Sequence, residues 1–182
     1  MENDLRRKVR LVAGGHMRDT PPILTHWSVA SRETVRIALT IAALNDLEVK
    51  SSDVQGACLT APCEERIWTV LGPEFGPDEG KKALVARALH GLKSAGASHR
   101  RHISDCMRHL GHEPCKADAD LWMKLVVRPE DGFEHCAHML LYVDDALSTS
   151  HDAAKALTEL DHCFKMKDGS IGDPDVCLGA KL

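Results

Sequence analysis

Residues 138–147 read His-Met-Leu-Leu-Tyr-Val-Asp-Asp-Ala-Leu, and this segment contains the most informative feature of the chain. An apolar run from Met139 to Val143 precedes the adjacent acids Asp144 and Asp145, and a shorter apolar run follows them. A continuous apolar run bounded by polar residues is typical of a buried strand, whereas aspartate favours turns over strands. We therefore predict a β-hairpin with Asp144 and Asp145 at its tip.

A third acid, Asp53, makes a metal site a stronger interpretation of the Asp144–Asp145 pair. Two adjacent carboxylates repel each other, and oxygen ligands suit Mg²⁺ or Mn²⁺, although a solvated Asp-Asp turn is the plainer alternative. Residues 47–54 alternate apolar and polar side chains, which predicts a half-buried strand that places Asp53 at its end. An acid at a strand end and an acid pair on a distant hairpin are typical of a two-metal phosphoryl-transfer site, in which the ions lie about 3.5–4 Å apart.

The remaining pattern mixes helices and strands without regular alternation. Ser31 is a candidate helix N-cap, and Gly111 is a candidate helix stop. We expect helices at 31–46, 94–110 and 153–164, and strands at 6–13, 47–53, 67–70, 83–88, 121–127, 136–143 and 176–182. This order favours an α+β fold, an antiparallel sheet with helices packed on one face.

Composition narrows the class of protein. The chain has 182 residues, 43% of them hydrophobic, and a net charge of −4, which argues against a uniformly basic nucleic-acid binder. Local basic patches occur at 6–10 and 99–108. No apolar run approaches a membrane span and no signal peptide is evident, so we expect no membrane partner and an intracellular, cytoplasmic or nuclear location. The seven cysteines are then expected to be free thiols.

Six ordered blocks resemble one family. These are Arg10–His16, Ser28–Arg36, Ser52–Leu59, Gly91–Gly96, Tyr142–Asp145 and Leu178–Leu182. Together they span essentially the whole chain, and it resembles copia-type retrotransposon reverse transcriptases. The resemblance implies a right-hand polymerase fold with fingers at about 1–46 and 65–93, palm at about 47–64 and 94–174, and a primer-grip strand at 175–182.

The resemblance also implies a reaction and its partners. These are template-directed nucleotidyl transfer with Mg²⁺ (or Mn²⁺), an RNA or DNA template–primer duplex, deoxynucleoside triphosphates, and the thumb, RNase H and integrase segments of a polyprotein. Asp53, Asp144 and Asp145 would be catalytic and would hold the metal together with the carbonyl of Val54. The nucleotide- or primer-binding candidates are Lys8, Arg10, Val54, Cys58, Gly91, Lys93, Tyr142, Leu178 and Gly179.

One departure from the family pattern concerns the sugar. Cys58 stands where the family usually has an aromatic residue that blocks a ribose 2′-hydroxyl, so selection of deoxynucleotides is open. By the resemblance we expect the given sequence to reach the primer grip without a thumb, and we expect the isolated chain to be weak or inactive. One alternative is an inactive relic of the same fold. Another is a small zinc module using Cys106, His109, His112 and Cys115.

Overall fold

A computed structural model describes residues 11–17, 19–22, 25, 28–174, 176–177 and 180–181. The chain divides into two compact units, Met1–His26 with Cys58–His99, and Trp27–Ala57 with Arg100–Leu182. The division falls within helix α3 (Ala95–His109). These units are defined by contacts, and the assignment of residue ranges to fingers and palm stays a prediction.

The described part of the first unit contains a small core and a β-hairpin. It contains the 3₁₀ turns η1 (Gly15–Met17) and η2 (Pro73–Asp78), and the paired strands β2 (Trp68–Val70) and β3 (Lys82–Leu84). The strand expected at 83–88 is therefore shorter and begins earlier. The short helix α2 (Ala57–Thr60) starts at the boundary of this unit. Its buried core consists of Ala61, Ile67, Ala88, Leu92 and Ala95.

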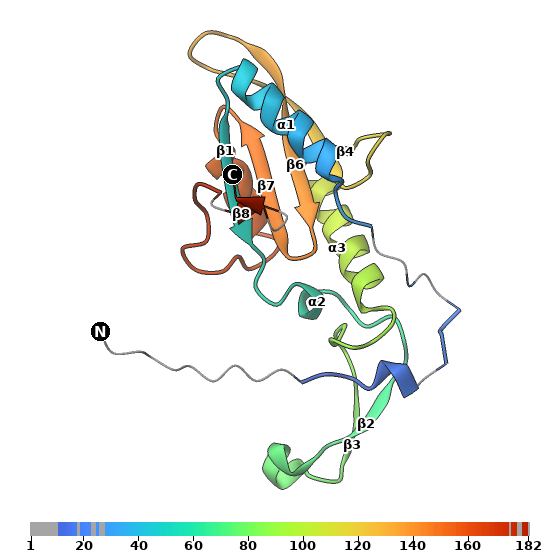
Figure 1. Cartoon of the computed structure of the whole chain (residues 1–182). Coiled ribbons are helices and arrows are strands. Elements are labelled where there is room, and N and C mark those ends of the chain that lie inside the picture. The colour runs from blue at the N-terminus through green and yellow to red at the C-terminus, as the bar shows by residue number, and fades with distance from the viewer. Residues whose placement is uncertain are drawn as a thin grey trace. The chain divides into compact units, whose positions relative to one another are not determined.

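A five-stranded antiparallel sheet organises the second unit (Figure 1). Its strand order is β1-β7-β6-β5-β4. The strands are β1 (Glu48–Asp53), β4 (Glu113–Pro114), β5 (Leu121–Val127), β6 (Glu134–Tyr142) and β7 (Asp145–Ser150). The expected strands at 47–53, 121–127 and 136–143 are thus present, and β4 was not foreseen.

Helices cover both faces of this sheet, so the expectation of helices on one face was wrong. Alternate residues of a strand point to opposite faces. On β6, Leu140 packs with Val35 and Ala38 of α1 (Arg32–Leu44). Its neighbours Met139 and Leu141 pack in a separate cluster with residues of α3 and of α4 (Ala153–Asp161). Strand β6 is buried on both faces, and this explains why its sequence is an unbroken apolar run and not an alternation of apolar and polar residues.

Helix ends are fixed by side chains that the sequence already marks. Ser31 caps α1 by accepting a hydrogen bond from the Thr34 N–H, as predicted. Asp118 reinforces this end by accepting from the Ser31 N–H at 2.9 Å and from the Thr34 hydroxyl at 2.6 Å. Gly111, with φ 82°, ends the segment after α3, as expected for a glycine stop. The N-terminus of α1 is thereby tied to the loop before β5.

The prediction of a single C-terminal strand was wrong, because the structure has two short strands there. Instead of one strand over 176–182, Val176–Cys177 (β8) and Ala180–Lys181 (β9) pair with each other in antiparallel fashion. Within the described residues, no helix has the length and apolar character needed to cross a membrane.

Candidate active site

The hairpin between β6 and β7 places the two adjacent acids differently from the prediction. Tyr142 pairs with Asp145, so the loop consists of Val143 and Asp144, and Asp145 opens the returning strand. Val143 has φ 58° at the first loop position, a conformation that hairpins of this length normally give to glycine. A β-branched residue in this region is strained, and such strain concentrates at functional sites. The hairpin therefore presents Asp144 from its loop and Asp145 from its strand.

Strand β1 brings the third acid to the same place. It pairs antiparallel with β7, and the register sets Asp53 opposite Asp145. The Val54 N–H donates to the Asp144 carbonyl at 2.7 Å and extends this register past the strand end. Carboxylate oxygens of Asp53, Asp144 and Asp145 lie within 4.8 Å of one another. The predicted convergence of the three acids is confirmed, whereas their catalytic role stays a prediction.

The electrostatics of this acid cluster (Asp53, Asp144 and Asp145) favour a cation. Partial burial raises the pKa of the Asp145 carboxyl, and the charges of Asp144 and Asp53 raise it further. Lys167 supplies one positive charge, with its ammonium nitrogen 3.5 Å from Asp53 Oδ2. The cluster offers three carboxylate oxygens at a spacing that fits Mg²⁺ or Mn²⁺. A bound cation would also favour the ionised form of Asp145, which its surroundings disfavour. These residues could hold such an ion.

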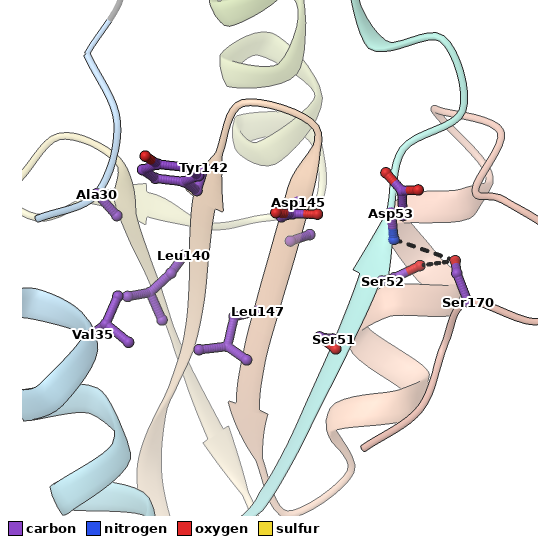
Figure 2. Close-up of a pocket in the computed structure, with 11 residues that line it drawn as sticks. Ala30, Val35, Ser51, Ser52, Asp53, Leu140, Tyr142, Asp145, Leu147 and Ser170 are labelled. Carbon is purple, nitrogen blue, oxygen red and sulfur yellow. Dashed lines mark hydrogen bonds between the residues drawn. The ribbon is translucent and has the colours of Figure 1, made fainter. Parts of the chain in front are cut away.

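Asp53 is held by a segment that the sequence analysis did not single out. Its N–H donates to Ser170 Oγ at 3.2 Å, and the Ser52 and Ser170 hydroxyls lie 2.8 Å apart (Figure 2). Its carbonyl accepts from the Lys167 N–H at 2.9 Å. The Lys-Asp-Gly-Ser sequence at 167–170 is a turn signal, but nothing in it indicates that the turn faces Asp53.

A small cavity opens beside the acids, between α1 and the sheet (Figure 2). Its volume is about 120 Å³. Val35, Leu140 and Leu147 give it an apolar side, and Asp53, Asp145 and Tyr142 stand at its polar end. A cavity of about 150 Å³ accommodates a benzene-sized group, so this one can receive a small apolar group next to the carboxylates.

Other predicted site residues have separate positions. Val54 is buried and Tyr142 lines the cavity, both in the unit of the acid cluster. Cys58, Gly91 and Lys93 belong to the other unit. Cys58 is half-buried in α2. Lys8, Arg10, Leu178 and Gly179 lie outside the described residues.

Gly91 and Lys93, which fall in the range expected to form the fingers, make contacts within their own unit. Gly91 has φ 90°, and a Cβ atom added there would clash with the Ala13 carbonyl oxygen. Its predicted close approach is therefore made to the chain's own backbone. Lys93 donates to the Thr20 hydroxyl at 3.2 Å.

The zinc alternative is not supported. Cys106 is paired with Cys163 in a disulfide and is not available as a thiolate ligand. In the part of the chain that the structure describes, the side chains of the acid cluster lie close enough together to hold a metal, and His109, His112 and Cys115 form no such group. The expectation that all seven cysteines are free thiols fails for the same pair, because fold proximity cannot be inferred from cysteine spacing.

A family comparison identifies the class. The chain belongs to the reverse transcriptase (RNA-dependent DNA polymerase) family, whose sequence model matches residues 1–181. A similar protein is the retrovirus-related Pol polyprotein from transposon TNT 1-94 of Nicotiana tabacum, 31% identical over 188 aligned residues. This alignment covers 98% of the chain and 13% of the polyprotein, so the chain spans a small part of its relative's length. The match supports the copia-type resemblance. No solved structure matches the chain.

Proposed function

We propose that the chain is the nucleotidyl-transfer region of a retrotransposon reverse transcriptase and that Asp53, Asp144 and Asp145 are its catalytic carboxylates. The observation that carries the proposal is the convergence of these acids within 4.8 Å at the meeting point of β1 and the β6–β7 hairpin. Family membership and the polyprotein relative support the same reading. The inactive-relic alternative gains no support from this geometry.

Each acid has a distinct part in the proposed site. By the family resemblance, Asp53 and Asp144 would hold Mg²⁺ or Mn²⁺, and Asp145 would be the supporting acid. The carbonyl of Val54 would be a further oxygen donor. When bound, the metal would activate the primer 3′-hydroxyl and stabilise charge on the departing pyrophosphate.

The chain's own residues supply positioning. The β1–β7 register and the hydrogen bonds of Lys167 and Ser170 fix the backbone of Asp53 on both sides. The two-residue hairpin loop fixes Asp144. Rigid placement of reacting groups is worth many kcal/mol in such reactions, of the order of 7–11 kcal/mol in well-oriented cases. The template–primer duplex and the deoxynucleoside triphosphates are the proposed partners, and a right-hand polymerase fold is the proposed architecture.

Metal-dependent stabilisation tests this proposal. Mg²⁺ or Mn²⁺ should raise the melting temperature of the parent, because a ligand that binds the folded state alone stabilises it. Asp144→Asn should abolish the shift. Asp105→Asn is the matched control, since it removes the same charge from an exposed position on α3, and it should shift like the parent.

The chemical step is tested with the same proteins by single-nucleotide extension of a DNA primer on an RNA template. Slow, Mg²⁺-dependent extension is expected from the parent and from Asp105→Asn, and none from Asp144→Asn. A metal-induced shift of equal size in Asp144→Asn and the parent would refute the proposed site, because the ions would then bind elsewhere.

A further inference from the structure

The outer edge of β1 is lined by the segment that follows α4. Residues 165–172 run antiparallel to β1, with isolated bridges between Val54 and Met166 and between Ser51 and Gly172. Main-chain hydrogen bonds of 2.9 Å join the Gln55 N–H to the Lys165 carbonyl and the Lys167 N–H to the Asp53 carbonyl. The segment is thus attached to the strand that carries a catalytic acid.

This attachment fixes where the Lys167 side chain begins. The Lys167 N–H is bonded to Asp53, and the Ser170 N–H donates back to the Lys167 carbonyl at 3.0 Å, which closes a turn. Gly169 in this turn has φ 70°, a conformation that glycine adopts without strain. The ammonium group lies 3.5 Å from Asp53 Oδ2, although the two side chains are 67% and 38% exposed.

The ion pair of Lys167 with Asp53 affects the electrostatics of the whole acid cluster. Three carboxylates with oxygens within 4.8 Å of one another repel, and a neighbouring positive charge reduces that repulsion. A divalent ion would neutralise the same carboxylates more completely. It would also repel an ammonium that stays on the same oxygen. The lysine and the metal therefore compete for Asp53.

We propose that Lys167 is an internal counter-ion of the acid cluster and that a divalent ion displaces its ammonium from Asp53 on binding. Lys167 is a positioning residue in this scheme, because it acts through Asp53 on the metal. The inference rests on the proposed function, since it needs a metal at these acids. Its consequence is that the chain binds divalent ions more weakly than its three acids alone would allow.

Mn²⁺ titration calorimetry tests the competition in four proteins. These are the parent, Lys167→Gln, Lys167→Arg and the control Lys165→Gln. Lys165 is exposed and contributes its carbonyl to the β1 contact, so its replacement changes the net charge equally and keeps the main-chain bond. We expect Lys167→Gln to bind Mn²⁺ about fivefold more tightly than Lys165→Gln, since an exposed ion pair is worth at most about 1 kcal/mol. Lys167→Arg should bind like the parent.

Equal affinities of Lys167→Gln and Lys165→Gln would overturn the inference, because the effect would then be one of net charge. Weaker binding by Lys167→Gln would overturn it as well. A parent that binds no Mn²⁺ would instead refute the proposed function, and this result appears before any variant is compared.

A second measurement needs no metal. Urea unfolding in EDTA of the parent, Lys167→Gln, Asp53→Asn and the double variant gives the coupling between the two side chains. A favourable coupling is expected, and its absence would overturn the counter-ion role. Because Lys167 is largely exposed, its replacement leaves no buried gap to obscure this result.

Discussion

Replacing Asp145 with asparagine should stabilise the metal-free protein and at the same time weaken its response to metal. Asparagine has nearly the same shape as aspartate, and the main-chain pairing of Asp145 with Tyr142 and Asp53 is kept. The variant loses one charge from the acid cluster, in which partial burial and then the charges of Asp144 and Asp53 disfavour ionisation of Asp145. The acid cluster is thus expected to lower the free energy of unfolding when no cation is bound.

The size of this gain follows from the spacing of the carboxylates. At the limiting separation of 4.8 Å, two unit charges in a water-like dielectric repel by about 0.9 kcal/mol. Physiological salt reduces this to about 0.5 kcal/mol. Asp145 takes part in two such pairs, so Asp145→Asn should raise the free energy of unfolding by about 1 kcal/mol.

Urea unfolding at neutral pH in EDTA, followed by the same titration with Mg²⁺, measures both effects. The parent should gain stability from Mg²⁺, and Asp145→Asn should gain much less. The sign of the pH dependence is also fixed. Because the folded-state pKa of Asp145 is raised above 3.8, the advantage of the variant should be absent below that pH and grow as pH rises through the raised pKa. A variant less stable than the parent in EDTA at neutral pH would refute this reasoning.

Three further predictions concern stability and are read by urea unfolding. Val143→Gly should raise the free energy of unfolding by about 1 kcal/mol, because glycine accepts φ 58° without strain, whereas Val143→Ala should gain less; a loss with glycine would contradict the strain. Burial, assisted by the charge of Lys124 and opposed by that of Glu159, lowers the pKa of His112 from 6.5 to about 4, so the unfolded chain binds the extra proton first. The parent should therefore lose about 3 kcal/mol relative to His112→Gln as pH falls from about 6.5 to about 4, and parallel curves would exclude a buried neutral imidazole. Burial raises the pKa of the Asp118 carboxyl, but hydrogen bonds from Ser31, Thr34 and Asp120 outweigh it and lower that pKa. Asp118→Ala should therefore cost about 1 kcal/mol at neutral pH, and the difference from the parent should shrink as pH falls below 3.8 through the lowered pKa.

Local signals predicted most of the elements. The Ser31 cap and the Gly111 stop are properties of a few neighbouring residues, and both were foreseen for that reason. The strand ending at Asp53 was visible as period-two alternation. Strand β4 was missed because two residues carry no period, and Pro114 is a poor strand residue.

Features that depend on long-range partners were not predictable. The alternation around Asp53 says which residues share a face, but the pairing of β1 with β7 is a property of the whole sheet. For the same reason the contact of the turn at 167–170 with Asp53 and the disulfide of Cys106 with Cys163 could not be foreseen. The hairpin tip was placed one residue late, because aspartate signals a turn but not which of two adjacent aspartates remains in the loop.

The lining of β1 by residues 165–172 also bears on how far this edge of the sheet is open to another chain. A sheet of five strands has two outer strands, and an open outer strand can recruit a strand from another chain. On β1 the donors and acceptors of Ser51 and Asp53 that face outward are already bonded to the chain itself. On β4 the outer strand is two residues long and contains Pro114, which has no N–H to offer. The geometry that holds Asp53 in place thus also closes the outer edge of β1 around Ser51 and Asp53 to a strand from another chain.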